Sequence, residues 1–383
     1  MSSTSRTHQA IRDHAQRAVD DGVWPAAQFA VARNGELLAF ESFGRARDSD
    51  RFCMFSATKP IVASVVWQLL GEGLITLETR VAKVWPEFGA HGKDVITLEQ
   101  VLLHTCGFPN ATLDATTATT RDERAALMAD WRLEWQPGTR YAYHGYSAHW
   151  VLAELIQRLT GQDHRQAVRT RVLDPLGLKR LELGVPKERQ GDLKRVSATG
   201  KHAVDVLEAL LGRPVDEQAL DASESAVLTV ANDPELIALG VPGANAFSNA
   251  ADVAIFYQEL LWNSSQVWQP DVLQDATRRI RNTLPDEILM GAPANRTIGL
   301  TVTGPGDGVA LEIPSLGISA SLRPFGPHVS EHAFGHGGAG GQAAWADPES
   351  GLSFCLLTNG MDRDAVADRR RHDAIEGLAA QWA

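Results

Sequence analysis

Cysteine is scarce in this chain of 383 residues, which contains only Cys53, Cys106 and Cys355. So small and odd a number excludes the disulfide framework that holds small secreted domains together. Long apolar runs are also missing, because the longest, residues 60–70, ends at Gly71 and is too short to span a bilayer. The first residues lack the apolar core of a signal peptide, so we expect a cytoplasmic protein.

Positive charge is in deficit as well. The chain has 36 Lys and Arg against 47 Asp and Glu, a net charge of −11 at pH 7. Such a surface repels phosphate backbones and anionic lipid, so we expect neither nucleic acid nor a membrane as a partner. The 44% of hydrophobic residues is ample for a core and excludes intrinsic disorder. The length allows one large domain or two to three smaller ones, and leaves the oligomeric state open.

Strand-like patterns occur at both ends of the chain. Asn34-Gly35 separates the runs 28–33 and 36–42, and this dipeptide is the strongest short hairpin signal because both turn residues accept positive φ. A second hairpin is predicted within residues 342–358. Helical periodicity or composition predicts helices over residues 6–22, 60–70, 97–103, 121–131, 146–159, 204–211, 251–261 and 363–383.

Hairpins at both ends that enclose a helix-rich middle indicate a sheet domain built from both termini, with a helical insertion. We therefore predict an α+β fold, an α/β sandwich. The sheet domain is expected over residues 1–75 and 240–383, and the mainly helical domain over residues 76–239. The stretch 182–241, with its clusters of Gly, Asp and Glu, shows the least pattern and is interpreted as a mobile excursion.

The first candidate for catalysis is Ser56-Ala-Thr-Lys59, the one S-x-x-K match in the chain. It opens the most apolar predicted helix, and residues three apart lie on one helical face, so the Lys59 amine is expected near the Ser56 hydroxyl. Burial lowers the pKa of a lysine and makes it a plausible base. A helix N-terminus also favours a developing oxyanion. The alternative interpretation is an ordinary capping serine.

Two later clusters contain further residue types that catalysis uses. Tyr141, Tyr143 and Tyr146 stand close together, with Gly145 between the last two. Each of the three tyrosines is a candidate for the one that takes part in catalysis. The second cluster is the glycine-rich run 335–341, which leads into the second hairpin. Glycines without side chains allow a strand to approach a substrate closely.

In this order the clusters resemble the motifs of the serine β-lactamase and penicillin-binding-protein-like hydrolases, especially class C β-lactamases and family VIII carboxylesterases. Residues 96–107, 175–178 and 345–349 fit as well, so the resemblance runs from about Gly22 to Asn359. The family's S-x-x-K, Y-x-N and K-T-G or H-x-G motifs are matched by Ser56/Lys59, Tyr143/Gly145 and His336/Gly337/Gly338.

The resemblance implies a β-lactamase/transpeptidase-like fold, in which helices flank an antiparallel sheet and a mainly helical domain is inserted. It also implies that Ser56 attacks a carbonyl to form an acyl-enzyme, with Lys59 and Tyr143 sharing the general-base role. The backbone N–H groups of Ser56 and Ala339 would form the oxyanion hole. No cofactor and no metal are implied. The residues expected to contact the substrate are His336, Gly337, Gly338 and Gly145.

Two departures from the family pattern bear on the substrate. Gly145 stands where class C β-lactamases have an asparagine that binds the substrate's amide side chain. His336 replaces a lysine and, being mostly neutral at pH 7, is a weaker partner for a substrate carboxylate. Both changes favour a small-molecule neutral ester, so we predict a carboxylesterase. The alternatives are a β-lactamase, a D-amino-acid peptidase or amidase, an acyltransferase, or a non-catalytic binding protein of the same fold.

Two other motifs suggest different chemistry. Residues 328–332, His-Val-Ser-Glu-His, match the H-x-x-E-H metallopeptidase motif, which needs a helix that places both histidines on one face. Pro327 and Gly335 leave little room for one, so we expect loop histidines. Residues 335–340 match G-x-G-x-x-G, but a strand rather than a helix is predicted to follow. His104 is expected to be a buried histidine that bonds to the backbone.

Overall fold

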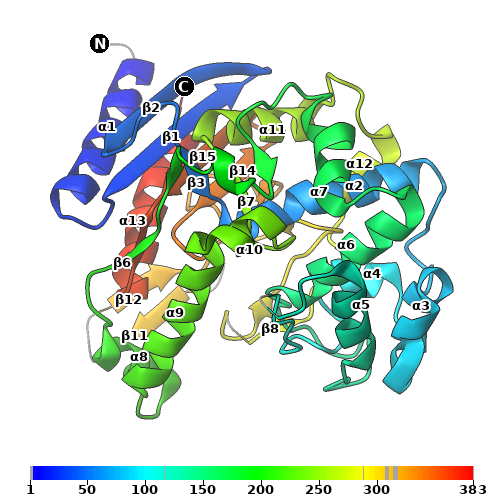
Figure 1. The fold of residues 1–383 in the computed structure, drawn as a ribbon. Coiled ribbons are helices and arrows are strands. Elements are labelled where there is room, and N and C mark those ends of the chain that lie inside the picture. Colours follow the sequence, from blue (N-terminus) through cyan, green and yellow to red (C-terminus); the bar gives the residue numbers. More distant parts are fainter. Residues whose placement is uncertain (1–2, 116, 288, 307–309, 314–317, 383) are drawn as a thin grey trace.

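The computed structural model describes residues 3–115, 117–287, 289–306, 310–313 and 318–382. Its main sheet is antiparallel, with the strand order β10-β13-β14-β15-β1-β2 (Figure 1). The pairing of β1 with β15 joins the two ends of the chain. The strands are β1 (Ala26–Arg33), β2 (Glu36–Gly44), β10 (Thr301–Val302), β13 (Phe334–Gly335), β14 (Ala343–Asp347) and β15 (Leu352–Thr358).

Both predicted hairpins are confirmed. β1 pairs with β2 across Asn34 and Gly35, whose φ values of 54° and 79° are the left-handed conformation that such a turn requires. β14 pairs with β15 at the other end of the chain. The α+β class predicted from these patterns is therefore confirmed.

Helices cover both faces of the sheet (Figure 1). α1 (Ser3–Asp20) and α13 (Ala365–Ala380) pack on the face that receives Ala27, Phe29 and Val31 of β1. The alternate residues of β1 point to the opposite face, where α11 (Ala250–Trp262) lies. This period-2 alternation, with small alanines under α11, is what allows one strand to be buried on both sides.

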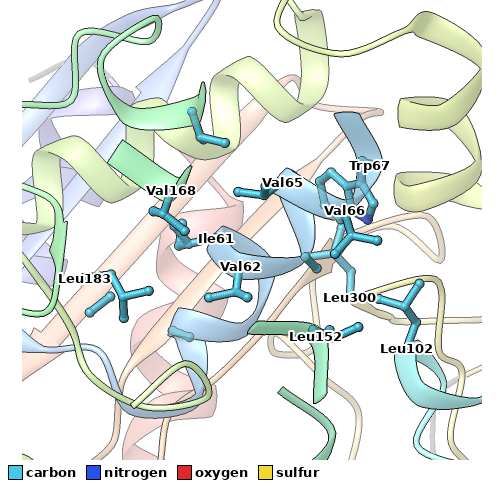
Figure 2. Packing of buried hydrophobic residues seen from close by; sticks show 14 of the residues in the cluster. Ile61, Val62, Val65, Val66, Trp67, Leu102, Leu152, Val168, Leu183 and Leu300 are labelled. Atoms are coloured by element: carbon cyan, nitrogen blue, oxygen red, sulfur yellow. The ribbon is translucent and has the colours of Figure 1, made fainter. Parts of the chain in front are cut away.

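The helix that follows the S-x-x-K serine, α2 (Lys59–Gly71), is surrounded by apolar side chains from several elements. Figure 2 shows its residues pointing in different directions, toward Leu152, Val168 and Leu300 among others. Because α2 is apolar on nearly every face, ten of its thirteen residues are buried, including all of its first two turns. The helices packed against it are α6 (Ser147–Thr160), α7 (His164–Val168) and α12 (Pro270–Arg278). The helical part also contains α3 (Val81–Val84) and α4 (Leu98–Leu102), which pack on α6, and α5 (Arg121–Asp130).

The interpretation of residues 182–241 as an excursion is wrong, because short strands tie this stretch into the fold. β4 (Glu182–Leu183) and β5 (Leu193–Lys194) belong to a sheet of order β4-β7-β3-β5, with β3 (Arg51–Cys53) and β7 (Ala246–Ser248). Strands of two or three residues are too short to show a period in the sequence. The stretch also contains β6 (Ser197–Thr199), which pairs with β16 (Gly360–Asp362), and the helices α8 (Val204–Leu211), α9 (Glu217–Asn232) and α10 (Pro234–Leu239).

One hydrophobic cluster extends from the sheet into the helical part, joining Ala30 of β1 with Leu98 of α4 and Leu152 of α6. The proposed division into domains at residues 75/76 and 239/240 stays a prediction.

The three cysteines are free and buried. In the described part of the chain, no helix combines the length and apolarity needed to cross a membrane. Two further hairpins are β8 (Pro285–Asp286) with β9 (Ala292–Pro293), and β11 (Ala310–Ile313) with β12 (Ile318–Ser321).

Candidate active site

Ser56 lies in a short 3-10 turn, Phe55–Thr58, that leads directly into α2. The preceding residue, Phe55, has a φ of 45°, a left-handed conformation that costs energy for a residue with a side chain. The buried Phe55 ring supports the glycine-rich loop: a Cβ on Gly340 would lie only 2.6 Å from Phe55 Cε2. The loop can therefore pack this closely on the Phe55 ring because glycine stands at position 340.

Lys59 is buried one turn after Ser56, as the spacing predicts. Its Nζ lies 3.3 Å from Ser56 Oγ, 2.7 Å from the Gly145 carbonyl oxygen and 2.9 Å from that of Gly243. Burial holds the pKa of Lys59 well below its usual range, and the nearby positive charge of Arg296 lowers it further. A lysine in this environment is a candidate base at neutral pH.

Tyr143 alone of the three clustered tyrosines lines the cavity that contains Ser56. Lys59 Nζ lies 5.0 Å from the centre of its ring. The Tyr143 hydroxyl is buried beside Ser56 and makes no well-formed hydrogen bond among the described residues. Burial raises the pKa of Tyr143, and the Arg296 charge opposes this shift. Tyr141 is almost fully buried, whereas Tyr146 is exposed.

Two histidines fix the loop that presents Tyr143. The backbone N–H of His144 donates to His104 Nδ1 at 3.1 Å, which confirms His104 as a buried histidine bonded to the backbone. The backbone N–H of Phe108 donates to His144 Nε2, so His144 Nδ1 carries the proton that it donates to the Ala142 carbonyl. Burial lowers the pKa of His144 to about 4, and the ring therefore stays neutral in this role.

The fold brings the three sequence motifs to one cavity of about 550 Å³. His336 Nδ1 lies 2.7 Å from the Gly337 carbonyl, so this nitrogen is the donor and Nε2 is left as an acceptor. Burial, with Arg296 nearby, holds the pKa of His336 well below its usual range. The residues of the motifs that line the cavity are Ser56, Tyr143, His336, Gly337, Gly338 and Ala339.

Arg296 is a functional candidate that the sequence did not reveal. Its guanidinium carbon lies 5.3 Å from the ring centre of Tyr143 and 6.0 Å from that of Tyr141, and Nη1 donates to His336 Nε2 at 3.2 Å. It lines the same cavity as Ser56. The cavity therefore contains a strong cation where the sequence suggested only a neutral histidine. Arg296 belongs to no motif, and only folding places it beside His336.

The competing motifs lack the structures that their chemistry needs. Residues 328–332 form turns rather than a helix, so the two histidines do not share a helical face. Within the part of the chain that the structure describes, no group of three or more His, Cys, Asp or Glu side chains is placed to hold a metal ion. The glycine-rich run 335–340 is followed by β14, a strand, as predicted.

Comparisons with known proteins point to one family. The family model described as Beta-lactamase matches residues 11–378. The esterase/beta-lactamase LipL of Mycobacterium tuberculosis is 27% identical over 321 residues, which cover 80% of this chain and 68% of the relative. Esterase EstB of Burkholderia gladioli is 27% identical over 366 residues, or 86% of this chain and 84% of the relative. The crystal structure of a family VIII carboxylesterase has a TM-score of 0.77 and 25% identity, covering 98% of both chains.

Proposed function

The chain belongs to the β-lactamase family, and we propose that this serine hydrolase cleaves small carboxylic esters through an acyl-enzyme on Ser56. The observation that carries the proposal is the contact of the buried Lys59 amine with the Ser56 hydroxyl, beside the cavity that Tyr143 and His336 line. A serine is a weak nucleophile unless a neighbouring base takes its proton.

The three contacts of Lys59 are compatible with a neutral amine in the base role. An ammonium group would donate to the carbonyl oxygens of Gly145 and Gly243 and to Ser56 Oγ. A neutral amine that donates to the two carbonyls keeps a lone pair that can accept the Ser56 hydroxyl proton, and this is the form we propose. The lowered pKa of Lys59 agrees with this assignment.

In the proposed first half-reaction, the Ser56 oxygen bonds to the ester carbonyl carbon and its proton moves to Lys59. The carbonyl electron pair moves onto oxygen, where the backbone N–H groups of Ser56 and Ala339 would stabilise the charge. The carbon–oxygen bond to the alcohol then breaks, and the alcohol leaves with a proton delivered through Tyr143. In the second half-reaction, water replaces the alcohol, the acid is released and Ser56 regains its proton.

Esters are favoured over amides because Gly145 offers no side chain to bind a substrate amide, and because one relative is named an esterase and another an esterase/beta-lactamase. A second candidate, hydrolysis of a β-lactam or of a peptide that ends in a carboxylate, is favoured by Arg296. Its guanidinium provides in the cavity the cation that a substrate carboxylate would bind.

A substrate panel tests the proposal. Purified protein is assayed with p-nitrophenyl acetate, a cephalosporin and a D-alanyl peptide, and a slow ester is used to trap an adduct for intact-mass and peptide analysis. We expect kcat/KM for the ester to exceed that for the cephalosporin, and the acyl group to be found on the peptide that contains Ser56. A preference for the cephalosporin would instead support the second candidate.

The Arg296 charge predicts a shift in the pH dependence. Hydrolysis needs neutral Lys59, whose fraction rises with pH through its pKa, and Arg296 lowers that pKa. Arg296→Gln removes the cation and raises the Lys59 pKa, so the rising limb of kcat/KM against pH should move to higher pH. Arg158→Gln is the control, because its guanidinium lies 5.2 Å from the Trp85 ring, outside the cavity. A limb that does not move in Arg296→Gln would contradict the prediction.

A further inference from the structure

Residues 337–341, the glycine-rich loop of the Ser56 cavity, pack against the side chain of His372. His372 belongs to α13, the red helix beside α1 in Figure 1, and lines the Ser56 cavity. A Cβ built on Gly341 would lie only 2.9 Å from His372 Nε2. Gly341 also has a φ of 80°, a conformation that glycine adopts at little cost. The loop and the imidazole are therefore so close that only glycine fits at position 341.

The loop also rests on Phe55, the residue before Ser56. A Cβ on Gly338 would lie 3.1 Å from Phe55 Cβ, and one on Gly340 would lie 2.6 Å from Phe55 Cε2. The loop is thus packed on both the Ser56 turn and α13. Ala339, in the middle of the loop, lines the Ser56 cavity, and among the described residues its backbone N–H donates to no other group. The packing of the loop therefore decides where this N–H points.

His372 has a carboxylate near each of its ring nitrogens. Nε2 lies 3.6 Å from Asp368 Oδ1, one turn earlier on α13, and Nδ1 lies 3.8 Å from Glu376 Oε1, one turn later. Only the protonated ring has an N–H on both sides, so only this form attracts both carboxylates. A neutral ring presents a lone pair to one of them. Loss of the proton therefore favours a movement of the ring, and Nε2 is the atom that packs against Gly341.

The charges that surround His372 favour its protonated form. Burial alone would lower the pKa of His372, but the charges of Asp368 and Glu376 overcome this effect and raise it. Burial lowers the pKa of His14, so this second histidine adds no positive charge at neutral pH. The charged and titratable groups around the ring are Asp368, Arg369, Arg371, Asp373 and Glu376 of α13, His14 of α1 and Asp362 of β16.

We propose, on the basis of the proposed esterase function, that His372 is a positioning residue. Its imidazolium, held by Asp368 and Glu376, supports the glycine-rich loop and keeps the Ala339 N–H in place for the developing oxyanion. His372 transfers no proton in the reaction and forms no bond to the reacting atoms. Its role differs from that of Lys59, which takes the Ser56 proton whatever atom the substrate carries at its carbonyl.

A pair of substrates separates these roles. In O-p-nitrophenyl thionoacetate, sulfur replaces the carbonyl oxygen of p-nitrophenyl acetate, and sulfur is a weak hydrogen-bond acceptor. Turnover of the thionoester therefore depends less on the oxyanion hole, whereas both substrates need Ser56 and Lys59. The oxyanion ratio is defined as kcat/KM for the ester divided by kcat/KM for the thionoester. A change in this ratio reports the oxyanion hole rather than the nucleophile or the base.

His372→Gln is the decisive variant, because glutamine keeps a hydrogen-bonding side chain but cannot carry the charge. The oxyanion ratio should fall at least about tenfold, which is part of the cost of about 10²–10³-fold for removing one oxyanion-hole donor outright. His14→Gln is the matched control. The rings of His14 and His372 lie 6.4 Å and 6.1 Å from that of Trp24, but His14 does not line the Ser56 cavity. This control should leave the ratio unchanged, and thermal unfolding checks that both variants fold.

The pH dependence of the oxyanion ratio is a second test. In the unmodified enzyme the ratio should be highest while His372 is protonated and should fall as pH rises through its raised pKa. The titration of Lys59 affects both substrates alike and cancels in the ratio. This pH dependence should disappear in His372→Gln. Asp368→Asn removes the charge beside Nε2 and lowers the pKa of His372, so the fall should move to lower pH even if His372→Gln does not fold.

Three results would overturn the proposal while leaving ester hydrolysis intact. The first is an unchanged oxyanion ratio in a folded His372→Gln. The second is an equal fall in His14→Gln, which would show a general loss of packing around Trp24. The third is a ratio that does not vary with pH in the unmodified enzyme, because the support is assigned to the charged ring. Failure of the proposed function itself would be distinct: no turnover of p-nitrophenyl acetate and no acyl adduct on Ser56.

Discussion

Ser56→Ala is expected to reduce ester turnover by at least about 10³-fold, because no other hydroxyl is assigned to attack the carbonyl. Ser56 is only partly buried and its turn is fixed by backbone and by Phe55, so loss of one oxygen should leave the fold intact. Steady-state kinetics with p-nitrophenyl acetate measure the loss, and thermal unfolding of both proteins checks the fold. The acyl adduct seen by intact-mass spectrometry should disappear.

Ser64→Ala is a matched control for this experiment. Ser64 lies on α2, the helix that follows Ser56, is fully buried, and donates its hydroxyl to the Ile61 carbonyl at 2.7 Å, outside the lining of the Ser56 cavity. Its loss should lower stability by about 0.5–1.5 kcal/mol, as is typical for one hydrogen bond, with little change in turnover. If Ser56→Ala retained more than about a tenth of the activity, Ser56 could not be the nucleophile.

The sequence predicts those parts of the fold that local patterns determine. The Asn34-Gly35 hairpin requires positive φ at two adjacent residues, and α2 is apolar at nearly every position. Both elements can therefore be predicted from the sequence without knowledge of any tertiary contact. The stretch 182–241 was misread because β4 and β5 are two residues each and acquire their partners only in the folded chain. Local patterns cannot show a strand whose pairing is entirely long-range.

The same distinction applies to the site. Ser56 and Lys59 are three residues apart, and helical geometry alone brings their reactive atoms together. Arg296 is separated from His336 by 40 positions and meets it through the packing of irregular segments, so no spacing rule identifies it. A cavity of about 590 Å³ beside Tyr143 is lined in part by α9, a helix that the sequence did not predict, so the sequence could not reveal this cavity either.

The opposite pKa shifts of Lys59 and Tyr143 suggest a division of work between them. Burial favours the neutral forms of both, which are the free amine of Lys59 and the protonated phenol of Tyr143. A neutral amine can take the Ser56 proton, whereas a phenol can give one to the leaving alcohol. Lys59 Nζ lies 5.0 Å from the centre of the Tyr143 ring, so both groups stand beside Ser56.

This division predicts that the effect of Tyr143→Phe depends on the leaving group. An alkoxide needs a proton in order to leave, so turnover of an alkyl ester should fall by about 10²–10⁴-fold, the usual contribution of a positioned acid or base. The p-nitrophenolate anion leaves without a proton, so p-nitrophenyl acetate should lose much less in its acylation step, measured as the burst in stopped-flow absorbance. Tyr141→Phe should lose much less with both esters, because Tyr141 is assigned no proton to transfer.

Lys59→Ala separates the two roles. Removal of the base should abolish acylation by either ester, or move the rising limb of the pH profile, since the leaving group does not change the need to deprotonate Ser56. Equal losses of the two esters in Tyr143→Phe would show that Tyr143 is the base instead. In that case the rate would rise with pH through the pKa of the Tyr143 phenol, which is raised, so the rising limb should appear at high pH. If Lys59 is the base, its lowered pKa puts the rising limb at lower pH instead.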